Sequence, residues 1–158
     1  MSQKKWATEA LESFDAVVAA IPGFRVREGQ RQMAAQIAQT LAALKQAGYQ
    51  IAVLSSNSEI NVRRTLGCAA EYIDQYRCGS DLFGKASRLK TLYRQTGCTP
   101  DTCLLIGDEI RDIDAARESG CDAASVSWGY NHPDVLAAKE PQYLFGTPDD
   151  ILAQLLPA

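Results

Sequence analysis

The stretch LLIGDEIRDIDAA, Leu104 to Ala116, places two aspartates four residues apart directly after an apolar run. Asp108 follows Gly107 at the end of that run, which has the length and composition of a buried strand. Asp112 lies one helical turn further on, so both carboxylates can face one point. Paired carboxylates suit magnesium, which keeps waters and a substrate phosphate in its shell. The alternative is that Asp108 caps the helix and Asp112 is solvated beside Arg111.

A second apolar run, IAVLSSNSE from Ile51 to Glu59, ends in hydroxyl and amide side chains. Ser55 stands at the end of this predicted strand. Hydroxyl and backbone N–H groups at the start of a helix form a site for anions. Ser56 and Glu59 predict a capping box for a helix that runs to Leu66. Ordinary N-capping explains the same residues without any ligand.

Lys85 opens a helix predicted over residues 85–97, between the two apolar runs. A lysine in the first turn of a helix is electrostatically unfavourable, because the helix dipole prefers anions there. A phosphate bound at the same place would remove the conflict. The alternative is an exposed lysine that only aids solubility.

Strands and helices alternate along most of the chain. Helices are expected at 30–48, 85–97 and 110–120, and the first of them has Met33, Ile37, Leu41 and Leu44 on one face. Strands are expected at 49–54, 102–107 and 123–129, with a weaker strand at 71–78. A strand followed by a helix is expected over 142–156. The strands are apolar throughout, which indicates a parallel sheet covered on both faces. Ligands of such sheets bind at the carboxyl ends of the strands, where Ser55 and Asp108 are expected.

The composition limits the classes of function. The chain has 158 residues, enough for about one domain, and a net charge of -3, which argues against nucleic acid as a partner. No apolar run approaches the roughly 18 residues of a membrane span, and the N-terminus has no signal-peptide pattern. Five cysteines without a C-x-x-C pair indicate reduced thiols. We therefore expect a cytoplasmic protein that binds neither nucleic acid nor membrane.

The order of the motifs resembles that of the haloacid dehalogenase superfamily. A strand with serine, a lysine at a helix start, and a strand with Gly-Asp-x-x-x-Asp are similar to its motifs two, three and four, over roughly residues 49–157. The phrases LSSNSE, LFGKA, IGDEIRDI and WGYN resemble phosphoglycolate-phosphatase-like members. The resemblance implies an α/β fold, a three-layer Rossmann-like core with a parallel sheet and little or no cap domain.

The resemblance also implies roles in phosphate binding. Ser55 would hydrogen-bond the transferring phosphoryl group, and Lys85 would neutralise its charge. The N–H of Ser56 and the side chain of Asn57 would line the phosphate pocket. The ligand implied is a small phosphorylated molecule.

A magnesium site is implied beside it. Asp108 would hold the ion with support from Asp112, although binding would be weak if other ligands are missing. Trp128 to Tyr130 would follow the next strand near the site, or only pack under the loop. His132, the lone histidine, is expected to be a surface turn residue and not an acid or base.

The chain departs from the family at its first motif. Family members attack phosphorus with the first aspartate of an Asp-x-Asp pair, and the second protonates the leaving oxygen. No Asp-x-Asp precedes Ser55; the acids available there are Glu9, Glu12, Asp15 and Glu28. The nucleophile is therefore not found.

Two interpretations of the N-terminal region remain open. Residues 6–21 fit a 3.6-residue period, which favours a helix and a missing first strand. Alternatively, FDAVVAAIPG (Phe14–Gly23) is a degenerate first strand, with Ala20 and Pro22 at the positions of the two acids. Residues 1–48 are expected to form an N-terminal helical region and residues 49–158 the core, together in one compact domain.

Three functions are compatible with this pattern. The first is a magnesium-dependent phosphatase of a small phosphomonoester, inactive or severely impaired. The second is a pseudo-phosphatase that binds a phosphorylated ligand or a protein, and the third is a shortened chain without its own function. The resemblance implies that the first strand lies between the strands that end at Ser55 and at Gly107. If that strand is missing, the two strands would pair with each other or accept a strand from another chain. We therefore expect a homo-oligomer or a protein partner.

Overall fold

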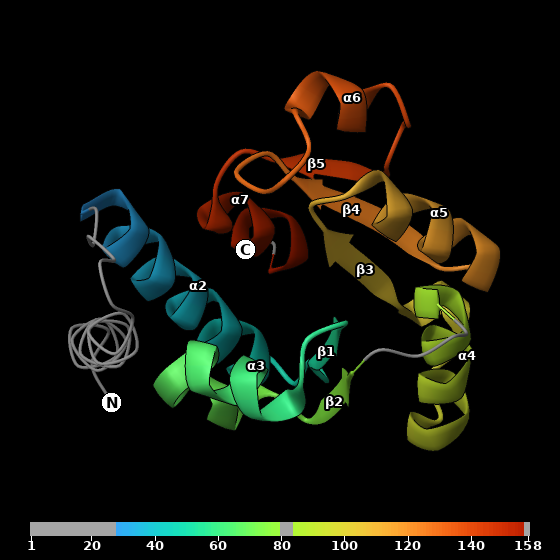
Figure 1. Cartoon of the computed structure of the whole chain (residues 1–158), viewed down its shortest axis with the longest axis horizontal. Helices are drawn as coiled ribbons and strands as arrows, with labels where there is room; N and C mark the ends of the chain where they lie inside the picture. The colour runs from blue at the N-terminus through green and yellow to red at the C-terminus, as the bar shows by residue number, and fades with distance from the viewer. Residues whose placement is uncertain (1–27, 80–83, 157–158) are drawn as a thin grey trace. The chain divides into compact units, whose positions relative to one another are not determined.

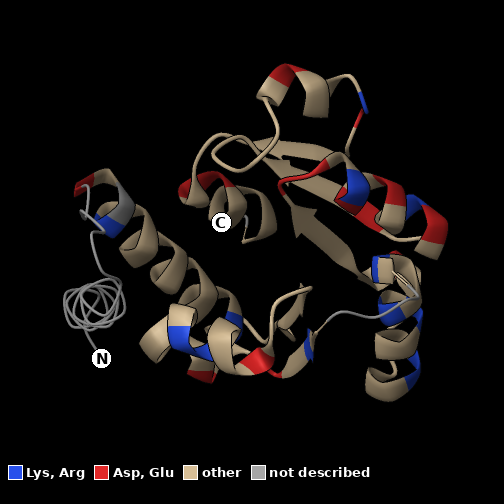
Figure 2. Ribbon diagram, viewed as in Figure 1, with Lys and Arg blue, Asp and Glu red and all other residues tan. Residues whose placement is uncertain are grey.

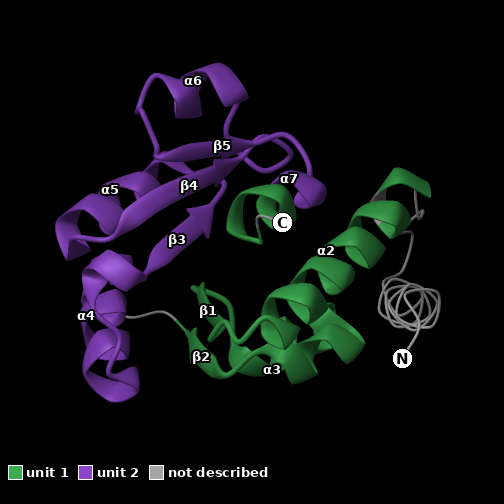
Figure 3. Ribbon diagram, turned by 180° about the vertical axis from the view of Figure 1, so that it is seen from behind, with its two compact units in different colours: residues 1–80, 151–158 green, residues 81–150 purple. Residues whose placement is uncertain are grey.

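A computed structural model describes residues 28–79 and 84–156 (Figure 1). The chain divides into two compact units, residues 1–80 with 151–158 and residues 81–150 (Figure 3), and each unit is described by itself. The segment 6–21 lies outside the described residues, so the choice between helix and strand stays open there. The predicted division between residues 48 and 49 also stays a prediction.

A short parallel sheet forms the centre of the first unit. Strand β1 (Ala52–Ser55) pairs with β2 (Gln75–Cys78), with Val53 opposite Tyr76. The connection runs through helix α3 (Glu59–Leu66) and the 3₁₀ helix η1 (Gly67–Tyr72). The parallel strands predicted around residues 49–54 and 71–78 are confirmed. Among the described residues, β1 pairs with β2 alone.

The start of α3 corrects the predicted capping box. Ser58, not Ser56, is the N-cap: its backbone is extended and its hydroxyl accepts from the N–H of Asn61 at 3.3 Å. Glu59 is then the first helical residue, too early for the third position that a capping box requires.

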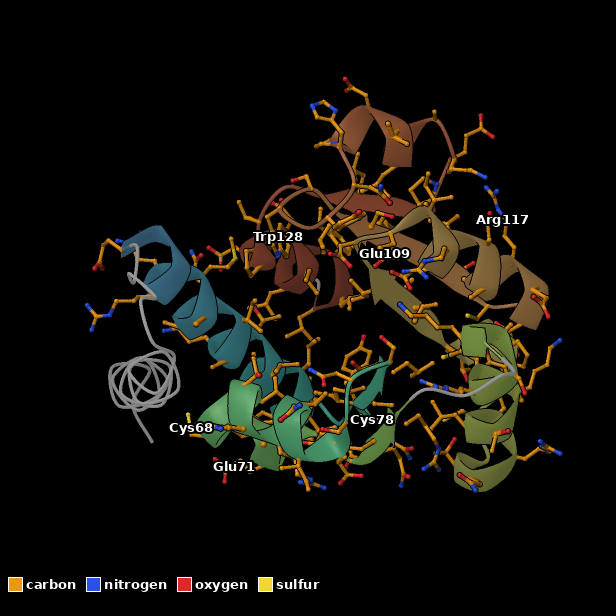
Figure 4. All side chains as sticks on the ribbon, in the orientation of Figure 1. Cys68, Glu71, Cys78, Glu109, Arg117 and Trp128 are labelled. Atoms are coloured by element: carbon orange, nitrogen blue, oxygen red, sulfur yellow. The ribbon has the colours of Figure 1, made fainter. Side chains whose placement is uncertain are left out.

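Helix α2 (Glu28–Gln46) packs through small side chains. Its charged residues lie near its two ends (Figure 2), which leaves a long uncharged middle. Ala35 and Ala38 form a buried cluster with Ala69 of η1, the 3₁₀ helix in which Figure 4 labels Cys68 and Glu71. Of the face predicted from periodicity, only Leu44 is buried; Met33, Ile37 and Leu41 are half-buried. Leu41 packs against the cluster, so the predicted face is confirmed in part and the contact also includes small alanine side chains.

Asp74 connects three segments of the first unit. Its carboxylate accepts the N–H of Ile51 at 2.8 Å and forms an ion pair with Lys45 near the end of α2. Burial opposes its ionisation, but the hydrogen bonds from Lys45 and Ile51 outweigh it and hold the pKa of Asp74 below its ordinary value. This carboxylate therefore stabilises the entry into both β1 and β2.

Asp74→Ala is expected to lower the free energy of unfolding by about 1–2 kcal/mol, because it leaves an N–H and a lysine without their acceptor. The lowered pKa means that this stabilisation is present above the ordinary pKa of 3.8 and is lost as the pH falls through the folded value. Urea unfolding at pH 7 and at decreasing pH measures both effects. Glu59→Ala, which removes an exposed pair with Arg63, is the control and should change stability by less than about 0.5 kcal/mol.

The second unit contains a three-stranded parallel sheet in the order β3-β4-β5. The strands are β3 (Leu104–Gly107), β4 (Asp122–Val126) and β5 (Tyr143–Phe145). Its helices are α4 (Gly84–Thr96), the 3₁₀ helix η2 (Pro100–Thr102), α5 (Ile110–Ser119), α6 (Pro133–Ala137) and the start of α7 (Pro148–Leu155). Its core includes Leu89, Ile113, Ala116 and Leu136, all almost fully buried. The predicted α/β fold with parallel strands is confirmed.

Glycines end two helices of this unit, close to the ends of the predicted ranges 85–97 and 110–120. Gly97 follows α4 with φ at 75°, and Gly120 follows α5 in the left-handed conformation with φ at 86°. The N–H of Gly120 donates to the carbonyl of Ala116 at 2.9 Å, which closes the helix. Across residues 28–79 and 84–156, no helix combines the length and apolar character needed to cross a membrane.

Candidate active site

Asp112 is a structural centre of the strand-to-helix turn. One of its carboxylate oxygens accepts the N–H groups of Asp108 and Glu109, each at 3.2 Å. Its side chain is only 3% exposed, so the alternative of a solvated surface residue is wrong. A Cβ on Gly107 would overlap this carboxylate, and the glycine therefore lets Asp112 fold back over the end of β3. The N-cap of α5 is Glu109 and not Asp108.

Lys85 pairs with the other carboxylate oxygen of Asp112. The lysine is the second residue of α4, and its side chain remains 32% exposed. The electrostatic conflict expected at the start of α4 is thus relieved by a carboxylate within the same unit. The alternative of a merely solubilising lysine is wrong, because Lys85 has a buried partner.

The loop after β4 binds directly to Asp108. One oxygen of the Asp108 carboxylate, Oδ2, accepts the N–H of Tyr130 at 2.8 Å. The Asp108 carbonyl accepts the N–H of Asn131 at 3.1 Å. A Cβ on Gly129 would come within 2.7 Å of the Asp108 carboxyl carbon, so only glycine permits this approach. Figure 4 labels Glu109, which follows Asp108 after β3, and Trp128, which precedes Gly129 in the loop after β4.

Two other predictions concern this loop. The ring of Tyr130 does not pack under the loop, because the residue is 82% exposed. His132 is the exposed N-cap residue of α6, and its Nδ1 accepts the N–H of Asp134 at 3.4 Å. The prediction of a surface turn residue is confirmed for His132.

The acidic residues of this unit fit a magnesium ion only in part. One carboxylate oxygen of Asp108 accepts the N–H of Tyr130, and the second oxygen is not part of that bond. By contrast, Asp112 forms an ion pair with Lys85, and Glu109 accepts a hydrogen bond from Arg111. No group of three acidic, histidine or cysteine side chains able to hold a metal occurs within the described residues. An ion held there would keep most of its waters, and the metal roles of Asp108 and Asp112 stay predictions.

The serine-rich loop after β1 belongs to the first unit. The hydroxyl of Ser55 accepts the N–H of Asn57 at 3.1 Å. The side-chain oxygen of Asn57 accepts the N–H of Ser58 at 2.9 Å and the side-chain amide of Asn61 at 3.1 Å. Ser56 is exposed. The loop is a compact turn at the carboxyl end of a parallel strand, as predicted, and the phosphate-binding roles of Ser55, Ser56 and Asn57 stay predictions.

The structure therefore brings Lys85, Asp108 and Asp112 together within one unit. It also reveals a residue that the sequence did not indicate: the side-chain oxygen of Asn131 accepts the N–H of Ile110 at 2.9 Å. The phrase WGYN pointed to this loop, but not to a contact with a helix start 21 residues earlier.

Comparison with known proteins assigns the family. The family model described as "Haloacid dehalogenase-like hydrolase" matches residues 13–126, well over half of the chain. The chain belongs to this family. The match begins well before residue 49, where the resemblance was expected to start, and it includes the segment with Ala20 and Pro22.

Curated family members of similar sequence are phosphoglycolate phosphatases. The chain is 33% identical over 118 residues to the phosphoglycolate phosphatase of Synechococcus elongatus, covering 73% of this chain and 56% of that protein. It is 32% identical over 127 residues to that of Vibrio vulnificus, covering 76% and 53%. The chain thus spans about half the length of the curated relatives that it matches.

Solved structures of the family share the fold. A haloacid dehalogenase-like hydrolase from Streptococcus pneumoniae has a TM-score of 0.66 at 16% identity, covering 97% of this chain and 91% of that chain. The 3-deoxy-D-manno-octulosonate 8-phosphate phosphatase of Moraxella catarrhalis has a TM-score of 0.59 at 27% identity, covering 77% and 68%. That structure contains a magnesium ion, a phosphate ion and a KDO molecule.

Proposed function

We propose that this haloacid dehalogenase-like protein binds a magnesium ion and a small phosphorylated molecule, with hydrolysis absent or severely impaired. One observation carries the proposal: the chain has the residues of three family motifs but no Asp-x-Asp before Ser55. The contacts of Lys85, Asp108 and Asp112 support it, because they form a hydrogen-bonded group at the carboxyl end of β3. The curated phosphatases and the magnesium-containing relative support the ligand class.

Asp108 is the residue that would hold the ion, through the carboxylate oxygen that Tyr130 does not engage. When bound, magnesium would supply positive charge against a phosphoryl oxygen. Asp112 keeps Lys85 ordered while the lysine stays in contact with solvent, and from there its ammonium can attract an anion. Ser55 would add a hydrogen bond to the phosphoryl group, in the role that the family motif gives it.

Hydrolysis lacks its covalent step in this proposal. The family forms a phosphoryl-aspartate with its first acid, and removal of a nucleophile costs several powers of ten in rate. The remaining electrostatic groups lower the barrier only in part. A domain with these residues can therefore bind a phosphorylated ligand without turning it over.

Phosphate release is expected to stay at background. The purified chain, assayed with phosphoglycolate and a panel of sugar phosphates, with and without magnesium, should release phosphate no faster than buffer. Asp108→Asn is the matched variant and should give the same trace. A magnesium-dependent turnover that Asp108→Asn abolishes would show an active phosphatase, and the pseudo-phosphatase proposal would be wrong.

Divalent binding is expected to be weak but specific to Asp108. Magnesium gives up its waters reluctantly, and few protein oxygens are available to replace them. Nuclear magnetic resonance titration with MgCl₂ should shift amides next to Asp108, and Asp108→Ala should remove those shifts. Tight binding that survives Asp108→Ala would place the ion elsewhere.

A protein partner or a second copy of this chain is also part of the proposal. Its support is that β1 and β3 each have one paired neighbour among the described residues, β2 and β4 respectively. Light scattering of the full chain at several concentrations tests it, and a stable monomer would contradict self-association.

A further inference from the structure

We propose that Asn131 is a positioning residue, which holds the Asp108 carboxylate in the orientation that a divalent cation needs. The inference rests on the proposed function, since it takes Asp108 as the cation ligand. It goes beyond that proposal because the roles implied by the family resemblance do not include one for Asn131.

Three hydrogen bonds join the loop after β4 to the turn after β3. Asn131 contributes two of them: its N–H donates to the Asp108 carbonyl at 3.1 Å, and its side-chain oxygen accepts from Ile110 at 2.9 Å. The third runs from the N–H of Tyr130 to the Asp108 carboxylate at 2.8 Å. Asn131 thus contacts both ends of the Asp108–Ile110 turn. These contacts fix the N–H of the neighbouring Tyr130 at the Asp108 carboxylate.

The side-chain bond of Asn131 is well placed to fix the turn. Ile110 is the first residue of α5, and its N–H is one of the donors that a helix leaves without an intrahelical partner. A side chain from another loop supplies the acceptor, so the loop and the helix start are fixed together. Asn131 is itself partly buried, which protects this bond from competition by water.

The consequence for Asp108 is a defined carboxylate orientation. Tyr130 engages Oδ2, so the other oxygen remains as the ligand that can face a cation. Gly129 allows the loop this close, because any Cβ there would overlap Asp108. Partners that orient a ligating carboxylate typically change metal affinity by about 10- to 100-fold when they are removed.

The test uses the full chain with Mn²⁺ as the probe, and reads binding from paramagnetic relaxation of amides near Asp108. Asn131→Ala should weaken Mn²⁺ binding by about 10-fold. Asn131→Asp keeps an acceptor oxygen of the same shape for Ile110, and should bind at least as tightly as the wild type. Amide exchange at Tyr130 should accelerate in Asn131→Ala and stay slow in Asn131→Asp.

A matched control separates positioning from loss of stability. Thr102→Ala removes the Thr99–Thr102 capping box of η2, just before β3 begins and thus at the other end of that strand from Asp108. It should lower the melting temperature without changing the Mn²⁺ affinity. If Asn131→Ala also changes only the melting temperature, the residue is merely structural and the inference is overturned. If the wild type binds no Mn²⁺ at Asp108, the proposed function fails first, and the positioning role fails with it.

Discussion

Asp112→Ala is expected to lower the free energy of unfolding by about 3 kcal/mol, a large fraction of the stability of an ordinary domain. The carboxylate accepts two backbone N–H groups and pairs with Lys85, and it is almost completely buried. Its removal leaves three donors without their acceptor in one place. Breaking a buried pair from one side is costly for this reason, although the partial exposure of Lys85 moderates the loss.

Urea unfolding followed by circular dichroism measures this effect, and the same helix offers the control. Asp114→Ala removes an exposed carboxylate that lies 3.4 Å from Lys139, and should change stability by less than about 0.5 kcal/mol. Lys85→Met should cost less than Asp112→Ala, because the two N–H groups keep their acceptor. Equal effects of Asp112→Ala and Asp114→Ala would contradict the structural role of Asp112.

The structural role of Asp112 gives the two aspartates of the Gly-Asp-x-x-x-Asp motif different functions. The sequence showed both carboxylates one helical turn apart and assigned both to the metal. The structure ties Asp112 to the helix start and to Lys85, and leaves one oxygen of Asp108 for a ligand. The spacing was therefore informative about the place, but spacing alone could not distinguish a ligand from the residue that supports it.

The fold was predictable where the information is local. Apolar runs located β1, β3 and β4, and Gly97 and Gly120 marked the ends of α4 and α5. The contact face of α2 was predictable only in part, because its buried cluster consists of alanines, with Leu41 packed against it. The N-cap of α3 was misplaced because three serines stand within four residues, and only backbone geometry selects Ser58.

Contacts between segments that are distant in the chain could not be predicted from the sequence. Asn131 accepts a hydrogen bond from Ile110, 21 positions away, and no periodicity or local capping pattern connects a loop residue with a helix start at that distance. The pairing of Lys85 with Asp112 is similarly non-local, with 27 positions between them. Family resemblance named both members of this pair but gave Asn131 no role, so the structure adds most at the loop after β4.

Restoring the first motif is expected to have the largest effect on activity. The double variant Ala20→Asp/Pro22→Asp places an Asp-x-Asp pair where the degenerate-strand interpretation puts the family's two acids. Both positions lie outside the described residues, so the prediction rests on the sequence and on a family match that begins at residue 13. We expect magnesium-dependent phosphate release from p-nitrophenyl phosphate to rise by at least about 100-fold over the wild type.

The chemistry of the restored step defines its controls. The carboxylate introduced at position 20 would attack phosphorus as the P–O ester bond breaks, and the acid introduced at position 22 would protonate the departing oxygen. Ala20→Asn/Pro22→Asp keeps the shape but removes the nucleophile, and should stay at background. Ala19→Asp/Ile21→Asp adds the same charges one residue earlier, on the opposite face of a strand, and should also be inactive.

These variants decide between the two interpretations of the N-terminal region. Activity in Ala20→Asp/Pro22→Asp alone would mean that FDAVVAAIPG supplies the family's first strand, and that two substitutions separate this chain from a phosphatase. Background rates in all three double variants, each shown to be folded by circular dichroism, would support the helix interpretation. Two acids spaced two residues apart on a helix would not both reach the phosphate. Loss of the gained activity in a further Asp108→Asn exchange would show that the restored acids and the residues of the β3 turn act on one substrate.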